Sequence, residues 1–373
     1  MSHALHPFHF DRQVVVLLGL PFDVVDMASA VATVRQSAAS GQRCFISTPN
    51  LNFLMAAQAD PAFRESVIHS DLSLTDGMPL VWLARLLRLP IRERVSGAGL
   101  FEQLCTQPGP PVSVYFFGGP PGIAERAADA VNRASHPGVV CQGGADPGAG
   151  SVLDMSSEAQ VQAINQSQAQ FVVVALGAKK GQQWIEHNRA RLTAPVLCHL
   201  GAVVNFAAGS VDRAPLRWQQ WGLEWLWRIK EEPALWRRYG QDGARFLGFL
   251  CTHLLPHAVF VRRKVSGMAQ PAQLSRPAAS GCPQLVLGGA WTQEGLVPLR
   301  QALKEIFWVE FARQLRIDLS GVTHVDSHFI GLVMLARSAF GHGLHIESAS
   351  PAVRKIFQYH AADYLLSRHS PVA

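Results

Sequence analysis

The chain has 373 residues, of which 48% are hydrophobic and 16% charged, enough for two or three domains with buried cores. No stretch approaches the roughly 18 to 20 uninterrupted apolar residues of a membrane span, and we expect no secretory signal because no basic region followed by an apolar one opens the sequence. The formal net charge of +6 falls within residues 213–264, where ten Lys or Arg stand against four Asp or Glu. A basic block of this kind predicts an anionic partner at that place.

The cysteine pattern argues against a disulfide framework. The six cysteines are scattered and include no CxxC pair. We therefore expect reduced thiols in a cytosolic protein and no metal site.

Residues 14–210 alternate short apolar runs with amphipathic stretches. Strands are predicted at 14–20, 43–50, 112–119, 138–144, 171–177 and 195–201, and helices at 27–40, 61–70, 122–135 and 157–170. This alternation predicts a Rossmann-like α/β domain with a mainly parallel sheet. Since ligands of such sheets bind beyond the carboxyl ends of the strands, the polar residues that follow each strand are the functional candidates.

Two of these strand ends carry side chains suited to proton transfer. Thr48 and Asn50 close one predicted strand, and Asp76, followed by Gly77, ends the next short apolar stretch. A carboxylate in such a position could remove a proton from an attacking hydroxyl. The alternative is an Asp that caps a helix or forms a turn.

Two glycine turns between a strand and a helix are candidate phosphate sites. Gly118 and Gly119 lie in FFGGPPG, and Gly177 lies in LGAKKGQQWI together with Gln182. Backbone N–H groups at a helix N-terminus suit a phosphate, although the second segment could equally be a solvated basic turn. Neither is a GxGxxG or Walker A motif, and the acidic residue of a nicotinamide-binding domain is missing.

Residues 213–264 form an appendage rich in Trp and Arg. Five of the nine Trp fall between residues 213 and 240, and three basic residues close the segment at 262–264. Trp218, Trp221 and Trp225 have the spacing of one helical face, which predicts a helix lying in the plane of an anionic membrane surface. The alternative is an ordinary helix pair with buried Trp. No nucleic-acid-binding motif accompanies the segment, so no nucleic-acid partner is expected.

A second α/β pattern follows a linker-like stretch at 265–283. Its strands are predicted at 285–291, 315–326 and 344–349, and its helices at 296–308, 327–340 and 351–360. The segment IDLSGVTHVDSHFIGLVMLARSA resembles the STAS domain of anti-sigma-factor antagonists, with Phe329 where the usual DSxG motif has Gly. The resemblance implies that phosphorylation of Ser327 switches the binding of a protein partner; the alternative is that Ser327 is only an N-cap.

The segments TPN, TDG, RVSG, FFGGPPG, LGAKKGQQWI, AAGSVDRAP, GLEWLWR and EPALWRRY follow one another in the first 245 residues. In this order they resemble the WecG/TagA/CpsF family of bacterial glycosyltransferases. The resemblance implies an inverting enzyme that moves a sugar, an N-acetylhexosamine or a hexose, from a UDP-sugar to an undecaprenyl-pyrophosphate-linked acceptor in polysaccharide synthesis. It also implies catalysis without a metal or other cofactor, and the chain contains no DxD motif.

The same resemblance implies roles for individual residues. Asp76 is the candidate general base, with Thr48 beside it. Substrate binding falls to a set of polar residues, glycines and arginines, some of which the appendage supplies as it folds over the site: Asn50, Arg94, Gly118, Gly119, Gly177, Gln182, Arg213, Arg228, Arg237 and Arg238. The chain departs from the family pattern at Gly99, Gly181, Asn205 and Leu235.

The domains implied are a transferase domain at 1–212, the appendage at 213–264, the linker at 265–283 and a STAS domain at 284–373. We expect a cytoplasmic protein held peripherally on the inner face of the cytoplasmic membrane. The sequence is compatible with a homo-oligomer. The alternative function is a catalytically impaired transferase fold that serves as a scaffold for protein binding through the STAS domain.

Overall fold

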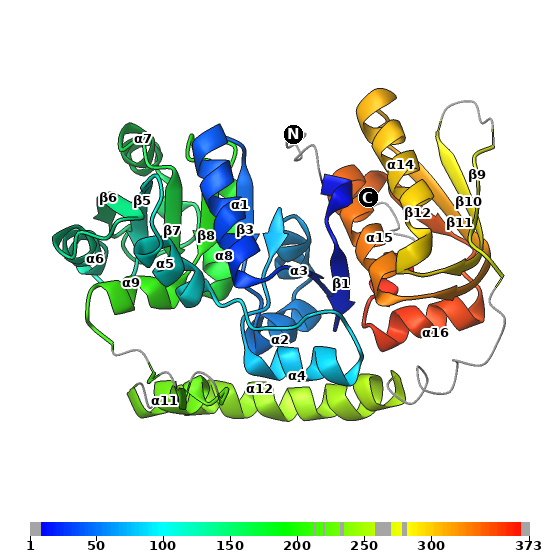
Figure 1. The fold of residues 1–373 in the computed structure, drawn as a ribbon, viewed down its shortest axis with the longest axis horizontal. Coiled ribbons are helices and arrows are strands. Elements are labelled where there is room, and N and C mark those ends of the chain that lie inside the picture. Colours follow the sequence, from blue (N-terminus) through cyan, green and yellow to red (C-terminus); the bar gives the residue numbers. More distant parts are fainter. Residues whose placement is uncertain are drawn as a thin grey trace. The chain divides into compact units, whose positions relative to one another are not determined.

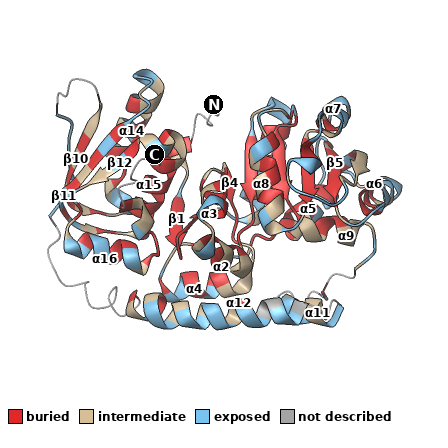
Figure 2. Cartoon of the chain, turned by 180° about the vertical axis from the view of Figure 1, so that it is seen from behind, coloured by how far each residue is buried: buried red, intermediate tan, exposed pale blue. Residues whose placement is uncertain are grey.

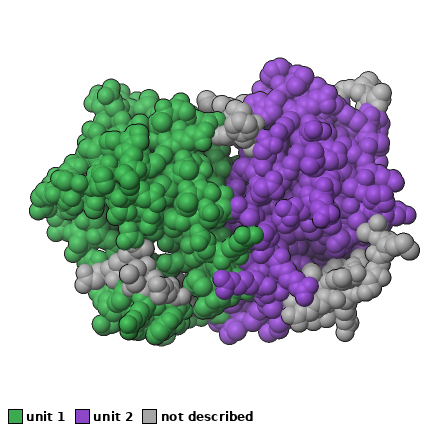
Figure 3. Space-filling model, viewed as in Figure 1, with its two compact units in different colours: residues 1–6, 25–82, 91–243 green, residues 7–24, 83–90, 244–373 purple. Residues whose placement is uncertain are grey.

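The computed structural model describes residues 9–211, 214–215, 217–218, 221–231, 235–257, 270–277 and 282–366. They fall into two compact units (Figure 3). Unit 1 contains residues 25–82 and 91–243. Unit 2 contains residues 9–24, 83–90 and those from 244 onward. The division therefore cuts across the linear domains expected from the sequence, because residues 9–24 belong with the C-terminal part of the chain.

Unit 1 is built on a six-stranded parallel sheet (Figure 1), which confirms the predicted fold class. The strand order is β4-β3-β8-β7-β5-β6. The strands are β3 (Cys44–Ser47), β4 (Leu72–Ser73), β5 (Val112–Gly118), β6 (Val139–Ala145), β7 (Phe171–Ala175) and β8 (Val196–His199). All neighbouring strands pair in parallel.

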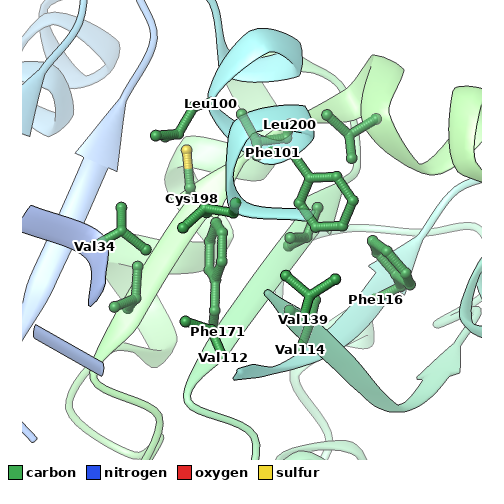
Figure 4. Packing of buried hydrophobic residues seen from close by; sticks show 14 of the residues in the cluster. Val34, Leu100, Phe101, Val112, Val114, Phe116, Val139, Phe171, Cys198 and Leu200 are labelled. Atoms are coloured by element: carbon green, nitrogen blue, oxygen red, sulfur yellow. The ribbon is translucent and has the colours of Figure 1, made fainter. Parts of the chain in front are cut away.

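Helices cover both faces of this sheet. On one face the strands pack against α1 (Met27–Ser40), α5 (Gly97–Thr106), α6 (Ile123–Arg133) and α9 (Gly201–Ala207), where side chains such as Val34, Leu100 and Phe171 meet (Figure 4). On the other face lie α7 (Glu158–Gln166) and α8 (Ala178–Asn188), with Trp184 fully buried. The strands of the sheet, apart from the edge strand β6 with its exposed Val140, are consequently buried on both sides (Figure 2), as is typical of parallel sheets.

Short polar signals set the ends of the helices. Asp26 caps α1 by accepting a hydrogen bond from the Ser29 N–H at 2.7 Å, and Gly41 ends that helix with a φ of 72°. Three more helices follow the first two strands of the sheet: α2 (Leu51–Ala59), α3 (Pro61–Ile68) and α4 (Met78–Leu86). Such local signals account for the helices predicted from the sequence, α1, α3, α6 and α7, whereas no bounds were predicted for α2, α4, α5, α8 and α9.

Unit 2 contains a four-stranded sheet in the order β12-β11-β10-β9. Its strands are β9 (Gln273–Ser275), β10 (Gln284–Trp291), β11 (Leu315–Val325) and β12 (Leu344–Glu347), and its main helices are α14 (Val297–Lys304), α15 (Ser327–Phe340) and α16 (Pro351–Tyr359). Strand β9 pairs antiparallel with β10 and lies inside the stretch expected to be a linker. The composition of this stretch did not indicate a strand. Strand β9 forms at the edge of the sheet through its pairing with β10.

The first apolar run of the chain is not a strand of the parallel sheet, as the sequence had suggested. It forms an antiparallel hairpin of β1 (Val14–Leu17) and β2 (Leu20–Asp23) in unit 2. The two turn residues, Leu18 and Gly19, have φ values of 46° and 79°. Two successive positive φ values match a tight hairpin turn, so the run folds back on itself.

The described part of the appendage includes α11 (Glu224–Glu231), α12 (Leu235–Phe249) and the π-helical turn η3 (Leu250–Leu254). The expected single helical face of Trp218, Trp221 and Trp225 is wrong, because the chain turns at Gly222 with a φ of 70° before α11 starts. Trp218 instead packs edge-on against Trp227, with ring centroids 6.0 Å apart.

Candidate active site

The carboxyl ends of the parallel strands in unit 1 meet at one edge of the sheet. Thr48 follows β3, Asp76 follows β4, and His199 ends β8, which lies beside β3. Strands β5 and β7 run into glycine turns at the same edge. This edge is where open parallel sheets bind ligands, and it gathers the polar residues of unit 1 that follow strands.

Asp76 combines burial with neighbouring charges of both signs. Its carboxylate is half-buried, and Oδ2 lies 3.5 Å from the Gly97 N–H at the start of α5. Burial raises the pKa of Asp76 to about 6, Arg94 and Arg228 act to lower it, and Glu224 raises it further. A carboxylate with this pKa is mostly ionised at pH 7 and is still basic enough to accept a proton from a hydroxyl in the transition state.

The two arginines beside Asp76 come from different elements. Arg94 precedes α5, and its Nη1 donates to Glu224 Oε2 of α11 at 2.6 Å. Arg228 of the same helix lies over the ring of Phe206, with its Cζ 5.7 Å from the centroid. Helix α11 therefore brings one cation and one carboxylate to the charge cluster around Asp76. Glu224 was not among the residues predicted for the site, although it lies within the segment GLEWLWR.

Thr48 and Asn50 both lie between β3 and α2 but have different surroundings. Thr48 is buried, and a Cβ placed on Gly97 would lie 3.3 Å from its methyl group, so it lines the approach of α5. The Asn50 Oδ1 accepts a hydrogen bond from the Phe53 N–H at 3.2 Å and caps α2. Asn50 thus has a structural role at the helix start in addition to its place at this edge.

The two glycine turns lead into helices that start without a side-chain cap, α6 at Gly122 and α8 at Gly177. Gly118 and Gly119 have φ values of 103° and 95°, and the Gly119 N–H donates to Ala175 O at 2.9 Å. Gly177, with a φ of 78°, precedes α8 without any side-chain cap, and no atom lies within 4 Å of where its Cβ would be. An uncapped helix start carries free N–H groups and a partial positive charge that favour an anion.

Gln182 is fully buried in the first turn of α8 and binds the sheet directly. Its Nε2 donates to Ser47 Oγ at 2.6 Å. Its Oε1 is buried without a hydrogen-bond partner among the described residues. The two lysines of the same turn are engaged as well, Lys179 in an ion pair with Asp60 at 2.5 Å and Lys180 by donating to Gly150 O at 2.9 Å.

His199 is a second residue at this edge that the sequence did not single out. Its ring is buried, its Nε2 has no hydrogen-bond partner in the described part of the chain, and burial lowers its pKa to about 4. A Cβ on Gly181 would lie 2.2 Å from His199 Cδ2. The neutral imidazole therefore occupies the space that a side chain at position 181 would need. Its place as a polar residue at the end of a predicted strand was the available signal.

The remaining candidates lie on or near the appendage. Arg237 is exposed, and its guanidinium lies over the Trp236 ring of its own helix, 5.7 Å from the centroid. Arg213 and the side chain of Arg238 are outside the described residues. Of the positions that depart from the family pattern, Gly99 is buried in α5, Asn205 lies in α9, and Leu235 begins α12.

Unit 1 exposes several large aromatic side chains. Trp82 of α4 is 49% exposed, Trp221 64%, Trp225 40% and Trp236 59%. A Cβ on Gly222 would lie within 2.6 Å of Met78 and 3.2 Å of Trp82, so the turn at Gly222 packs closely on α4. The lysine and arginine side chains among these rings include exposed Arg217 and Lys230, the latter over Trp227.

In unit 2, Ser327 is the first residue of α15 and is buried. The N-cap is Asp326, whose Oδ1 accepts from the Phe329 N–H at 2.9 Å. The alternative that Ser327 is itself the cap is therefore wrong.

Within the described ranges, no group of three or more His, Cys, Asp or Glu side chains could hold a metal ion. None of the helices in the described part of the chain is both long enough and apolar enough to span a bilayer.

Comparison with known proteins connects two successive parts of the chain to families. Residues 15–258 match the model of the glycosyl transferase WecG/TagA/CpsF family, and residues 274–367 match the model described as Mlab, STAS domain. A protein of Bacillus spizizenii named N-acetylglucosaminyldiphosphoundecaprenol N-acetyl-beta-D-mannosaminyltransferase is 29% identical over 195 residues, covering 52% of this chain and 74% of its own length. Proteins of the same name from Staphylococcus aureus strains MW2 and NCTC 8325 are 23% identical over 237 residues, covering 61% of this chain and 87% of theirs.

Proposed function

Because the chain belongs to the WecG/TagA/CpsF family of glycosyl transferases, we propose that it transfers a sugar from a UDP-sugar to an undecaprenyl-pyrophosphate-linked glycan. The names of its relatives in Bacillus spizizenii and Staphylococcus aureus describe transfer of N-acetylmannosamine to a diphosphoundecaprenol-linked N-acetylglucosamine. An N-acetylhexosamine donor is therefore the first to test, with a hexose as the second.

In the proposed reaction Asp76 takes the proton of the acceptor hydroxyl. The acceptor oxygen then bonds to the anomeric carbon as the bond from that carbon to the diphosphate breaks, which inverts the configuration. The diphosphate leaves with the electron pair, and positive charge near it lowers the barrier. We assign this role to Arg94 and Arg228, whose charges lower the pKa of Asp76. The N–H groups at the uncapped start of α8, after Gly177, are assigned to it as well.

The observation that carries the proposal is the environment of Asp76. Burial raises its pKa to about 6 while two arginines keep the charged form accessible. A carboxylate that only capped a helix would gain from strong hydrogen bonds to N–H groups, whereas the contact of this kind that Asp76 makes with a described residue, Gly97, is 3.5 Å long. Asp76 is thus poised for proton transfer.

The test is UDP release by the purified full chain supplied with UDP-N-acetylhexosamines and a short-chain lipid-pyrophosphate sugar. We expect release only when both substrates are present. Asp76→Asn removes the base and should lower kcat by about 10² to 10⁴ with little change in donor binding. Unchanged turnover in this variant would show that the base has been assigned to the wrong residue.

A second candidate function is a transferase fold retained as a scaffold. The observation that favours it is the loss of a side chain at Gly181, whose space is filled by the buried His199 ring. Calorimetry with UDP and UDP-sugars separates the two functions. Micromolar binding supports the enzyme, and no binding by a folded chain supports the scaffold.

We also propose that unit 1 attaches peripherally to the inner face of an anionic membrane. The support is the exposure of Trp82, Trp221, Trp225 and Trp236 together with neighbouring cations. Trp favours the interfacial region of a bilayer, and Lys and Arg pair with lipid phosphates. Attachment there would present the lipid-linked acceptor to the same unit that holds Asp76.

A further inference from the structure

Helix α15 of unit 2 is buried on nearly all sides. Twelve of its 14 residues are buried, including polar Ser327, His328 and Arg337. A helix that packs on one face of a sheet ordinarily leaves a polar stripe in solvent. The side of α15 away from the sheet is covered by β1 and the residues just before it, which lie beside it although they are some 300 residues away in sequence (Figure 1).

The first turns of α15 fit the hairpin through backbone contacts. Ser327 Oγ accepts from the Val16 N–H at 2.7 Å and donates to Val16 O at 3.0 Å, so one hydroxyl satisfies both polar groups of that residue. One turn further on, a Cβ on Gly331 would lie 2.4 Å from Val14 O. Only glycine at position 331 allows the hairpin to approach this closely.

Further contacts extend along the whole segment. His9 Nε2 lies 2.9 Å from Leu335 O, and Tyr364 donates to Gly19 O at 3.0 Å. Arg300 of α14 donates to the carbonyl oxygens of Phe10 and Arg12, and Lys304 pairs with Asp11 at 2.6 Å. Many of these bonds join a side chain of the C-terminal part to the backbone of residues 9–23, as in the capture of a peptide.

We propose that this face of α15 is a binding surface whose occupant is the chain's own segment 9–23, and that Ser327 is its latch. A negative charge at Ser327 expels the segment and frees the face, so any outside protein that binds there has to compete with the hairpin. In the present structure residues 9–23 cover this face of α15.

The surroundings of Ser327 disfavour an added negative charge. The hydroxyl is buried against Val16 O and next to the Asp326 carboxylate, which already binds two N–H groups and lies 3.5 Å from His328 Nδ1. The other titratable side chains packed here, His257 and His360, have pKa values lowered to about 4 and about 3 by burial and are neutral at pH 7. An added negative charge would therefore lie against Val16 O and the Asp326 carboxylate, with the Val16 N–H as a donor but no Lys or Arg among these contacts, which is costly in a buried site.

The test is hydrogen–deuterium exchange of the full chain, read by mass spectrometry on peptides that cover residues 14–23. In Ser327→Glu and in Gly331→Ala we expect these amides to exchange at least about tenfold faster, since one variant adds charge and the other a methyl group at the contact. The matched controls are Ser320→Glu at an exposed position of β11 and Gly240→Ala in α12, where nothing lies within 4 Å of the added Cβ. Both controls should leave residues 14–23 unchanged.

Gly331→Ala gives the sharper outcome because alanine favours a helix over glycine. Without the contact to the hairpin, the substitution would slow exchange in α15 and leave residues 14–23 alone, and that result would overturn the proposal. If Ser327→Glu unfolds unit 2 as a whole, the exchange of residues 14–23 is compared in Ser327→Ala instead, because this variant deletes only the hydroxyl. Selective acceleration in residues 14–23 supports the latch, and no selective change in either Ser327→Ala or Gly331→Ala refutes it.

Discussion

Asp76 is the residue at which opposing electrostatic effects can be separated. Burial disfavours its charged form, Glu224 adds to that effect, and Arg94 and Arg228 oppose it. The ion pair between Arg94 and Glu224 means that the two neighbours also neutralise each other. The pKa of about 6 is therefore a balance that a single substitution on α11 can shift in a known direction.

The first prediction concerns the pH dependence of kcat/KM. A general base must be deprotonated, so activity should be lost as the pH falls through about 6 and should reach a plateau above about 7. Glu224→Gln removes a negative charge and frees Arg94, and both changes stabilise the Asp76 carboxylate. The midpoint of the acidic limb should move down by about 1 pH unit.

The control for this shift is Glu231→Gln, an exposed residue of the same helix. Its pH profile should coincide with that of the parent chain. An upward shift in Glu224→Gln, or an equal shift in both variants, would contradict the role given to Glu224.

At the scale of elements, α8 packs on β8 through the pair Gly181 and His199. Adding a Cβ at position 181 places it 2.2 Å from the His199 ring, so Gly181→Ala should lower the free energy of unfolding by about 1 to 3 kcal/mol. His199→Ala opens that space, and the double variant should recover about 1 kcal/mol or more relative to the sum of the single changes.

Chemical denaturation of the four chains of this cycle measures the coupling. Gly243→Ala serves as the reference for glycine replacement, because nothing lies within 4 Å of its added Cβ. Simple additivity of the two changes would mean that the ring moves away and that α8 is not held by this contact.

At the scale of the whole molecule, the exposed aromatic residues of unit 1 predict binding to lipid vesicles. Trp221→Ala combined with Trp225→Ala should weaken sedimentation with phosphatidylglycerol vesicles by at least about tenfold, because two amphipathic rings lose their interfacial contact. Added salt should weaken binding of the parent chain, and uncharged phosphatidylcholine vesicles should bind less.

Leu153→Ala is the matched control for vesicle binding, since this side chain is 69% exposed and belongs to another part of unit 1. It should bind as the parent does. Equal losses in Leu153→Ala and in the Trp variants would point to general surface hydrophobicity and not to a defined membrane face.

The parts of the structure that could be predicted from sequence are those set by local rules. Helices 27–40 and 327–340 have the predicted bounds, because each follows an Asp cap and shows clear periodicity. The prediction failed for elements whose structure depends on contacts with residues far away in the sequence. Strand β9 is ordered by β10, and the hairpin is held by a helix more than 300 positions away.

The same distinction holds for the candidate site. Asp76, Arg94 and Arg228 lie in recognisable segments, and the structure brings their charges together. Glu224 and His199 gain their importance from partners on other elements, Arg94 in one case and Gly181 in the other. No local pattern in the sequence marks such pairs.

The contact between Val16 and Ser327 also has a consequence for synthesis of the protein. The hairpin leaves the ribosome before α15 does, and the serine that binds it lies 311 positions later. At about 5 to 20 residues per second, roughly 15 to 60 s pass before its partner exists. During that time β1 and β2 lack the helix that covers them, so slower translation of the C-terminal part should increase aggregation of the nascent chain and a bound chaperone should reduce it.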